Sequence, residues 1–420
     1  MKITFLCKGT RGDARPLLAL AKQWRRSKPA WQVTLACTFS VSCTLSQEIG
    51  NDIEVVKLPD QPAQQMSSEE LTKLLRAEVE CCLAASHDTS IIVFNLFTLE
   101  GWFIANHLSI PCVAASPFLL NRAPPDRFYK ELQAVQPEIF DSLKHASPGQ
   151  VSMAEVDHWM WRLFLDDLGD ACASVGLQNV PFLKDTQVLL PSPTPLLYGI
   201  SPSLLRQQAF WPDSVRVCGC WEMTSPDPQL VPNKELVTLV ESMSSPLIFI
   251  GFGSMETLYR QVIDWKKTVT DINSALAACN AFALWQCYTD EVRQVFKDLS
   301  PGRICHWKGS FPHCWLFQHC VGVVHHGGIG TTTSALRAGL PAVVCPFQSE
   351  QHYWAEQLSW LGVGVQCPSI KTASINDYLR SFKTILSTPL SDAAKQLQLK
   401  IQNEDGIKIA LSVIEQQLKK

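Results

Sequence analysis

The strongest chemical signal in the sequence is a glycine-rich loop with two histidines, spanning His325 to Thr331 (HHGGIGT). The loop follows the apolar run 321–324 and precedes a helix-like segment at about 331–339. The first amides of a helix have no partner within it, and the helix dipole favours negative charge there. His326 can donate a hydrogen bond to a phosphate oxygen. A plain turn would need only a capping side chain, so this loop favours diphosphate binding.

The second signal is a carboxylate, Asp13, in the loop Gly9-Thr10-Arg11-Gly12-Asp13 after the strand-like run 2–7. A carboxylate within hydrogen-bond reach can take the proton of a hydroxyl nucleophile as a new bond forms. Asp is also an ordinary helix cap, for a helix starting near Ala14, and both roles can hold together. A cap alone would not require the preceding glycine-rich run, so we predict that Asp13 is a general base.

Alternating strand-like and helix-like segments must position these loops. The strand-like runs are 2–7, 32–37, 53–58, 91–94, 112–116, 246–250, 281–286, 303–307, 321–324 and 342–345. Such alternation is typical of βαβ units with parallel sheets. Ligands of open parallel sheets bind outside the carboxyl ends of the strands, where both loops are expected.

The chain length of 420 residues predicts two domains. We expect an N-terminal α/β domain over 1–221 and a similar C-terminal domain over 246–390. Between them, 222–245 reads as a linker because its first part carries three prolines and shows no periodicity. Residues 391–420 are expected to be helices that can pack back on the N-terminal domain.

Composition narrows the class of protein. The chain is 46% hydrophobic and 18% charged with a net charge of −3, which argues against disorder and against a nucleic-acid partner. No signal peptide and no apolar run of about 18 residues is seen, so we expect no transmembrane segment, although transient membrane-surface contact is compatible. Several of the sixteen cysteines lie in strand-like runs, which indicates reduced thiols and a cytoplasmic protein.

The segment from His325 to Gly339, with Leu340-Pro341 and Pro346 to Gln351, resembles the donor-binding signature of UDP-dependent glycosyltransferases with the GT-B fold. The similar branch is that of sterol glucosyltransferases and antibiotic glycosyltransferases. Further similar segments are 9–13 with Pro16, 211–221 and 251–255. The resemblance covers nearly the whole chain but is weak over 120–200, where this family chooses its acceptor. It implies two Rossmann-like domains with parallel sheets facing a central cleft.

The resemblance implies roles for individual residues on the donor side. The expected contacts to the diphosphate are His326, Gly328, Gly330, Thr331 and, from a facing loop, Ser254. Other expected donor contacts are His313 at the nucleoside, Glu350 and Gln351 at the sugar hydroxyls, and Thr10, Arg11 and Gly12 closing over the donor. The chain departs from the family where Glu350 and Cys314 replace the usual Asp and where Ala14 replaces the usual Val. The Glu350 change leaves the identity of the sugar open.

An apolar acceptor pocket is expected from aromatic residues in or beside the N-terminal loops, with core packing as the alternative for each. The candidates are Phe97, Trp102, Phe118, Tyr129 and Trp159. Metal binding is not expected, because the pairs His313-Cys314 and His319-Cys320 fit no common zinc spacing. Asp166, Asp167 and Asp170 read better as a solvated helix face.

The resemblance implies an inverting transfer of a sugar, with glucose favoured, from a UDP-sugar to a hydroxyl of an apolar acceptor such as a sterol or polycyclic lipid. Asp13 would be the base, and no metal or other cofactor is expected. Two alternatives remain open. A UDP-sugar epimerase on the same fold would need no acceptor pocket, which the aromatic-rich 97–164 region disfavours. An inactive glycosyltransferase-like partner protein would be expected to lose Asp13 or the His326 loop, and both are present.

Overall fold

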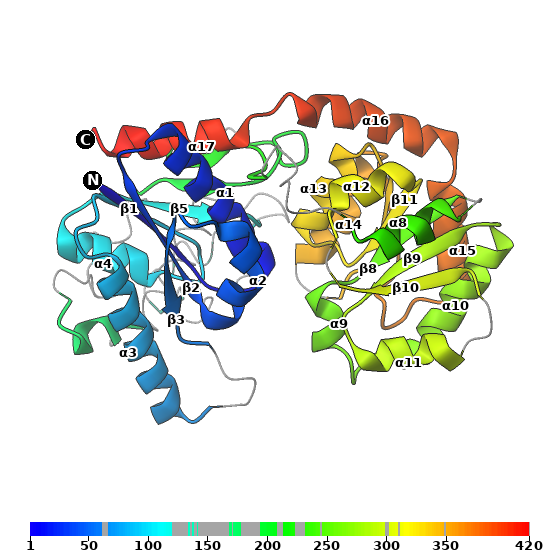
Figure 1. Ribbon diagram of the computed structural model, residues 1–420, viewed down its shortest axis with the longest axis horizontal. Helices are drawn as coiled ribbons and strands as arrows, with labels where there is room; N and C mark the ends of the chain where they lie inside the picture. The colour runs from blue at the N-terminus through cyan, green and yellow to red at the C-terminus, as the bar shows by residue number, and fades with distance from the viewer. Residues whose placement is uncertain are drawn as a thin grey trace. The chain divides into compact units, whose positions relative to one another are not determined.

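The computed structural model describes two compact α/β units (Figure 1). The described residues are 1–60, 66–119, 133–134, 137, 141, 168–169, 171–177, 194–207, 213–222, 232–243, 246–298, 302–309, 311–347 and 350–419. Residues 1–223 and 405–420 form the N-terminal unit, and residues 224–404 form the C-terminal unit.

The N-terminal unit contains a parallel sheet with the order β3-β2-β1-β4-β5-β6-β7. Its strands are β1 (Lys2–Cys7), β2 (Gln32–Thr38), β3 (Glu54–Leu58), β4 (Ile91–Phe94), β5 (Cys112–Ser116), β6 (Leu196–Tyr198) and β7 (Val215–Val217). The first five lie within one residue of the predicted runs. The last two, of three residues each, were not predicted from the sequence.

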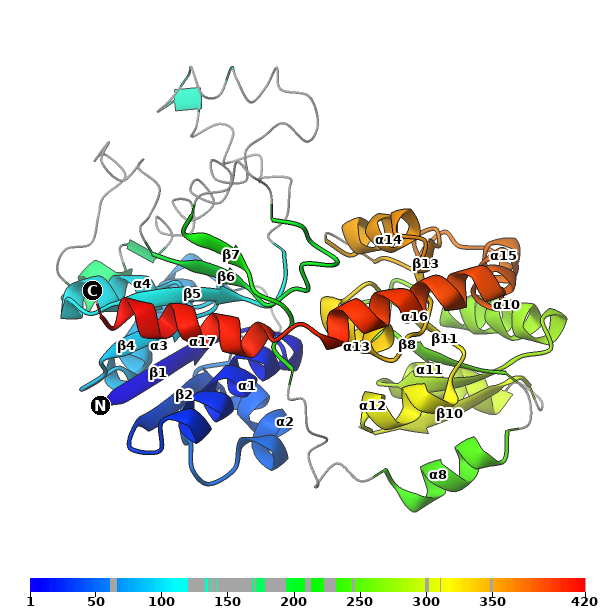
Figure 2. The ribbon, with the colours of Figure 1, turned by 90° about the horizontal axis from the view of Figure 1, so that it is seen from above.

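Helices cover this sheet. They are α1 (Arg11–Ser27), α2 (Phe39–Ile49), α3 (Ser68–Ala85), α4 (Glu100–Leu108) and the C-terminal α17 (Gly406–Gln417). Helix α17 lies beside α1 in both views (Figures 1 and 2) and contributes Ala410, Leu411 and Ile414 to the core. The Lys28 ammonium lies 2.9 Å from the Glu415 carboxylate at this contact. The last helix is therefore an integral part of the N-terminal unit.

The C-terminal unit contains a second parallel sheet, with the order β10-β9-β8-β11-β12-β13. Its strands are β8 (Leu247–Gly251), β9 (Phe282–Cys287), β10 (Ile304–Lys308), β11 (Gly322–His325), β12 (Ala342–Val344) and β13 (Gly364–Gln366). All but β13 correspond to predicted runs. The two parallel-sheet α/β domains predicted from the sequence are thus confirmed.

The helices of the C-terminal unit include several short ones at the ends of strands. They are α8 (Lys234–Glu241), α9 (Ser254–Leu258), α10 (Trp265–Ala278), α11 (Asp290–Asp298), α12 (His313–Leu316), the 3-10 turn η2 (Phe317–His319), α13 (Ile329–Arg337), α14 (Glu350–Trp360), α15 (Ile375–Ile385) and α16 (Thr388–Gln402). Helix α16 packs against α13, and the Gln398 amide donates to the Arg337 carbonyl at 2.8 Å.

The unit boundaries differ from the predicted ones at two places. Helix α8 lies inside the segment 222–245 that reads as a linker, and it packs in the C-terminal unit through Leu236 and Val240. The segment 391–420 is divided, because α16 belongs to the C-terminal unit and α17 to the N-terminal unit. The chain changes unit between Glu404 and Asp405.

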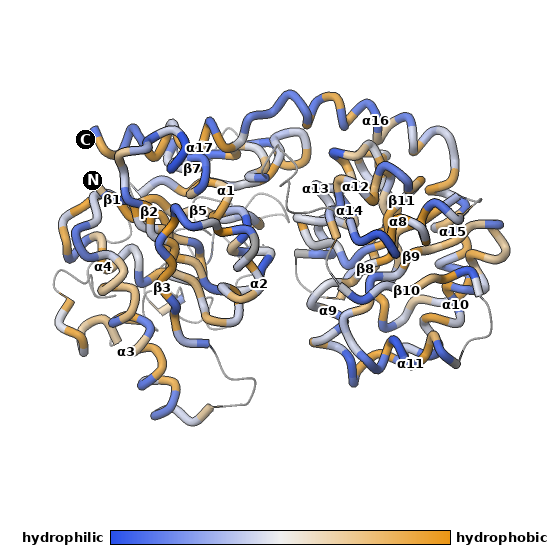
Figure 3. Tube along the Cα trace, in the orientation of Figure 1, coloured by the Kyte–Doolittle hydropathy of each residue, from blue (hydrophilic) through white to orange (hydrophobic). Residues whose placement is uncertain are grey.

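The cores follow from the apolar strands. Parallel strands with helices on both faces are buried on both sides and read as continuous apolar runs, as Leu247–Gly251 does. Figure 3 shows hydrophobic stretches along the strands and alternating colours along the helices. All sixteen cysteines lie in the described part of the chain as free thiols. Among the described helices, none combines the length and apolar character needed to span a membrane.

Candidate functional site

The predicted anion-binding loop forms the connection between β11 and α13. Strand β11 ends at His325, and α13 begins at Ile329 with Gly328 as its N-cap. Gly328 has no side chain to cap the helix, and the first amide that bonds back to the cap carbonyl is Thr332 N, at 3.1 Å. The amides of residues 329–331 therefore have no acceptor within the helix. Gly330 is exposed, so this helix end is open to an anion.

His326 lies half-buried between two glycine loops. A Cβ on Gly253 would lie 3.3 Å from the His326 Cε1, and a Cβ on Gly328 would collide with the Nε2 atom. Both glycines therefore make room for the imidazole. Burial lowers the pKa of His326 to about 4, and a hydrogen bond to the Gly251 backbone opposes this shift only in part. At neutral pH the ring is uncharged and places a nitrogen at the start of α13.

His325 supports the loop from beneath. Its ring is fully buried, and its Nδ1 accepts a hydrogen bond of 3.0 Å from the Gly327 amide. Gly327 has φ +93°, and a Cβ there would lie 2.9 Å from the Gln351 carbonyl oxygen. Of the two histidines, only His326 is expected from the sequence to contact a ligand, and His325 faces the interior. Burial lowers the pKa of His325 to about 3, with smaller contributions from His326 and His313.

We expect the stability of the C-terminal unit to fall as the pH is lowered from about 6.5, the ordinary histidine pKa, towards 4. In this pH range His325 binds a proton in the unfolded chain but not in the folded one, where it is buried. Acid therefore favours unfolding. Between pH 6.5 and 5 this residue alone accounts for about 1.6 kcal/mol, since each pKa unit is about 1.4 kcal/mol and the unfolded histidine is already half protonated at pH 6.5. His325→Asn keeps an acceptor for the Gly327 amide and should remove about half of the dependence in urea unfolding at the two pH values, because His326, whose pKa is also lowered, contributes the other half. An equally steep dependence in this variant would contradict the assignment.

The facing loop after β8 carries Ser254, exposed at the first position of α9. Gly253, with φ +56°, turns the chain into this short helix. The loop is held by Glu256, which the sequence reading missed. This buried carboxylate accepts bonds from the Tyr288 and Thr289 amides, each 2.8 Å, and from the Thr289 hydroxyl at 3.1 Å. Its partners lie 32 and 33 positions away in the sequence, so no local pattern marks it.

His313 begins α12 after β10. Its ring stacks on Phe317 with centroids 4.8 Å apart and planes inclined by 9°. It also contacts Phe249 and Phe311, with centroids 5.6 Å away in each case. The ring is half-buried on an aromatic cluster, while the neighbouring Cys314 is exposed. A flat, partly exposed ring held this way can lie against a nucleoside.

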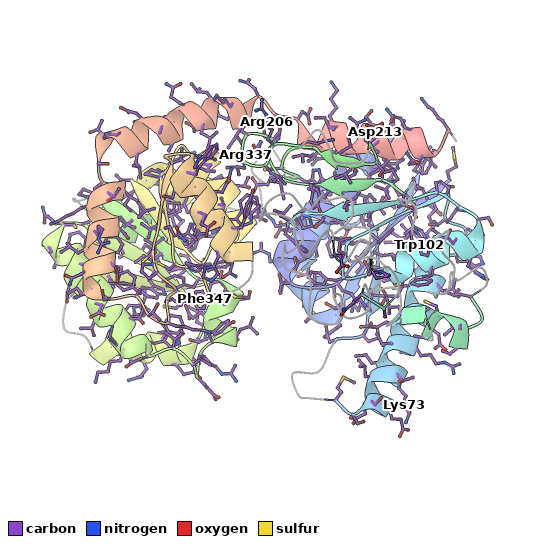
Figure 4. All side chains as sticks on the ribbon, turned by 180° about the vertical axis from the view of Figure 1, so that it is seen from behind. Lys73, Trp102, Arg206, Asp213, Arg337 and Phe347 are labelled. Atoms are coloured by element: carbon purple, nitrogen blue, oxygen red, sulfur yellow. The ribbon has the colours of Figure 1, made fainter. Side chains whose placement is uncertain are left out.

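The residues predicted to hold the sugar lie at the start of α14. Gln351 is buried, and its Oε1 accepts a 2.9 Å bond from the Phe347 amide (Phe347 is labelled in Figure 4). The Gln351 side chain thus fixes the loop after β12. Glu350 is the first residue of α14, and its side chain lies outside the described part.

Asp13 takes part in a capping box at the start of α1. Thr10 is the N-cap, and one Asp13 oxygen, Oδ2, accepts bonds from the Thr10 amide at 2.6 Å and from its hydroxyl at 2.8 Å. The helix therefore begins at Arg11 rather than near Ala14, and Asp13 is its third residue. Burial raises the pKa of Asp13, and the Thr10 bonds offset the rise only in part. A raised pKa makes the carboxylate a stronger base.

Gly9 is required by the position of this carboxylate. It has φ +109°, and a Cβ there would lie 2.5 Å from the Asp13 Oδ2. Any other residue would strain the turn and push the carboxylate away. Gly12 and Thr10 are exposed beside it.

Arg11, predicted to close over the donor, forms an ion pair inside the N-terminal unit. Its guanidinium contacts Glu48 Oε1, and the Arg15 Nε lies 2.7 Å from Glu48 Oε2. Burial alone would raise the pKa of Glu48, but Arg15 and Arg11 outweigh it and hold the pKa below its ordinary value. If Arg11 contacts the donor, its guanidinium must do so while it is paired with Glu48.

Two predicted acceptor residues lie side by side at the carboxyl ends of β4 and β5. The Phe97 and Phe118 rings have centroids 5.3 Å apart, and Phe97 is 48% exposed. Trp102, labelled in Figure 4, is half-buried on α4 with its ring against Phe103, at 5.4 Å. Tyr129 and Trp159 lie outside the described residues, as do Asp166, Asp167 and Asp170. In the described ranges no three His, Cys, Asp or Glu side chains gather as metal ligands.

Comparisons with known proteins agree with this geometry. Residues 299–404 match the family of the erythromycin biosynthesis protein CIII-like, C-terminal domain. A sterol 3-beta-glucosyltransferase of Candida albicans is 26% identical over 444 residues, covering 99% of this chain but only 28% of that protein.

Solved structures show the same fold over the whole chain. The glycotransferase of kitacinnamycin superimposes with a TM-score of 0.70 at 16% identity, covering 99% of this chain and 98% of the other. The glycosyltransferase VinC, solved with DTDP, gives a TM-score of 0.64 at 14% identity, with complete coverage of both chains. These comparisons confirm the resemblance seen in the sequence: the chain has the GT-B fold and is similar to sterol glucosyltransferases and antibiotic glycosyltransferases.

Proposed function

We propose that the protein transfers glucose from UDP-glucose to a hydroxyl of an apolar acceptor such as a sterol. The observation that carries this proposal is the match of 99% of the chain to a sterol 3-beta-glucosyltransferase. The matched stretch contains both loops described above. The chain spans less than a third of that relative's length, so the activity is proposed for the part that the two share.

The donor is proposed to bind at the carboxyl ends of β8, β10 and β11. Its diphosphate would accept hydrogen bonds from the α13 amides and from His326, with Ser254 adding a contact. The His326 ring is neutral, so it donates without adding a buried charge. The stacked ring of His313 would face the nucleoside. Glu350 is proposed to contact the sugar hydroxyls, whereas the Gln351 oxygen already bonds to the Phe347 amide.

The reaction is proposed as a single displacement with inversion at the anomeric carbon. Asp13 accepts the proton of the acceptor hydroxyl while the acceptor oxygen bonds to the anomeric carbon. The bond from that carbon to the diphosphate oxygen breaks, and UDP leaves with the electron pair. The α13 amides stabilise the charge that develops on the leaving diphosphate. The products are the glucoside, UDP and the proton, which Asp13 releases to solvent.

The acceptor is proposed to lie on the N-terminal unit, against Phe97 and Phe118. Their paired rings give a flat apolar contact of the kind that a polycyclic alcohol can cover. Because Phe97 is about half exposed, it is available to such a ligand.

The test is an acceptor screen with UDP-glucose, read by mass spectrometry, with Asp13→Asn as the negative control. A mass gain of one hexose on an apolar alcohol, with equimolar UDP, supports the proposal. Parallel arms with TDP-glucose and UDP-galactose identify the nucleotide and the sugar. Interconversion of a UDP-sugar without acceptor would instead support the epimerase. Failure to bind UDP or TDP at all would support an inactive partner protein.

We expect the activity to survive EDTA without loss. The diphosphate charge is proposed to be met by the N-terminus of α13 and by His326 rather than by a cation. Turnover is measured after dialysis against EDTA, with and without added Mg²⁺ or Mn²⁺. Complete loss that either ion rescues would contradict the proposal and direct attention to Asp166, Asp167 and Asp170.

A further inference from the structure

A buried ion cluster of Lys8, Glu78 and Glu100 lies directly before the loop that carries Asp13. Lys8 follows β1, and its Nζ lies 2.7 Å from Glu78 Oε2 on α3 and 2.6 Å from Glu100 Oε1 on α4. The three side chains are 8%, 0% and 0% exposed. Lys8 thereby ties the end of β1 to two helices of the N-terminal unit.

Such a cluster is an inefficient way to add stability. Removing an ammonium and two carboxylates from water costs several kcal/mol per ion, and their attraction repays this only in good geometry. Burial also raises the pKa of Glu78, so one carboxylate of the cluster resists ionisation. What the cluster supplies is a fixed position for the chain at residue 8.

A second anchor holds the main chain of the same residue. The Asn95 amide, in the loop after β4, donates through Nδ2 to the Lys8 carbonyl at 2.8 Å. Its Oδ1 accepts from the Phe97 amide at 3.2 Å and lies 3.4 Å from the Lys8 amide. One buried side chain therefore connects the loop that carries Asp13 with the loop that carries Phe97.

We propose, on the basis of the proposed function, that Lys8 and Asn95 are positioning residues that hold the Asp13 carboxylate in register with the acceptor loop at Phe97. Gly9 follows Lys8 directly and has no side chain with which to anchor the turn. The position of the turn is thus set by what holds residue 8. Neither residue touches the reacting atoms; both act through the backbone that leads to Asp13.

The test compares Asn95→Ala with a matched control, Ser86→Ala. The Ser86 hydroxyl is buried in the same unit and donates to the Cys82 carbonyl at 2.8 Å, away from Lys8 and Asn95. Asn95→Ala should lower kcat by about ten- to a hundredfold and raise the acceptor KM, since small misplacements of a base cost this much. Affinity for UDP should not change. Ser86→Ala should change each constant less than about twofold at a temperature where both variants are folded.

The pH profile distinguishes positioning from general loosening. In Asn95→Ala the freed turn should expose Asp13, so the acid limb of kcat should move to lower pH. Lys8→Arg keeps the cation and the backbone bonds, so its pH profile should stay close to that of the wild type. The double variant Lys8→Met/Glu78→Gln removes the ion pair, so its profile should shift as that of Asn95→Ala does. The double variant also replaces Asn95→Ala in every comparison if the latter does not fold. Equal behaviour of Asn95→Ala and Ser86→Ala, with an unmoved acid limb, would overturn the proposal.

One readout needs no substrate. The NMR signal of the Asp13 carboxyl carbon, identified because it is missing in Asp13→Asn, is titrated in the wild type, Asn95→Ala and Ser86→Ala. A lower pKa in Asn95→Ala alone supports positioning, and identical titrations reject it. If the wild type transfers no sugar to any acceptor, the proposed function fails while this titration still decides the role of Asn95.

Discussion

Asp13→Asn should reduce kcat by about 10²–10⁴-fold, the usual contribution of a general base, because an amide cannot accept the acceptor's proton. The folded structure should tolerate the change. Both bonds from Thr10 reach a single oxygen, Oδ2, and the Asn side-chain oxygen can take its place. Loss of a negative charge in the first helical turn costs about 0.3–1 kcal/mol. Burial disfavours the charged form of Asp13, which lessens that cost further.

A second capping box in the chain provides the matched control. At the start of α15 the Asp377 Oδ2 accepts from the Ser374 amide at 3.0 Å and from its hydroxyl at 2.6 Å. Asp377→Asn is therefore the same chemical change in the same motif, at a position with no proposed role in the reaction. Thermal melting and turnover are measured on the same preparations of both variants. Similar melting shifts with loss of turnover only in Asp13→Asn support the base.

Near-normal turnover in Asp13→Asn would remove this residue from the mechanism, whatever the melting temperature. The capping box would then be its whole role. A large loss of stability in Asp13→Asn, absent from Asp377→Asn, would point instead to a structural role at the end of β1.

The strands were predictable because burial on both faces makes them apolar runs of four to six residues, as in Lys2–Cys7 and Leu247–Gly251. The strands β6, β7 and β13, which were not predicted, have three residues each; β12 is equally short but lies in the apolar run 342–345. β6 also follows a proline-rich stretch that reads as a loop. These strands complete sheets that the longer ones define.

The candidate site was predictable where one loop carries the chemistry. Each of the two loops, that of His326 and that of Asp13, is a single continuous stretch of sequence. The structure places each loop at the carboxyl end of a strand. Helix α13 nevertheless begins two residues before the expected position, because Gly328 rather than a hydroxyl residue is its N-cap. Glycine is an accepted N-cap residue, and its use here reflects the room that His326 needs.

Supporting residues could not be predicted, because their partners are distant in sequence. Glu256 bonds to residues 32 and 33 positions away, and Lys8 pairs with carboxylates 70 and 92 positions away. No local pattern marks such pairs. A buried carboxylate or ammonium requires a partner, but only the fold supplies its identity.

His326→Ala should lower kcat/KM for the donor by about 10–150-fold, since a hydrogen bond to a charged group contributes about 1.5–3 kcal/mol. The bond is expected in both the ground state and the transition state, so KM should rise and kcat should fall. The pKa of His326, about 4, leaves the ring uncharged above pH 5, so the effect should not vary between pH 6 and 8.

The control for this prediction is another half-buried histidine of the C-terminal unit. His306 on β10 stacks on Phe296, with centroids 5.3 Å apart, and burial lowers its pKa as it does that of His326. His306→Ala removes a similar packed ring without touching the α13 loop, so it should change stability but not donor affinity. His326→Gln retains a donor and should recover part of the loss. UDP affinity by calorimetry, equal in His326→Ala and wild type, would show that the ring only fills the space between Gly253 and Gly328.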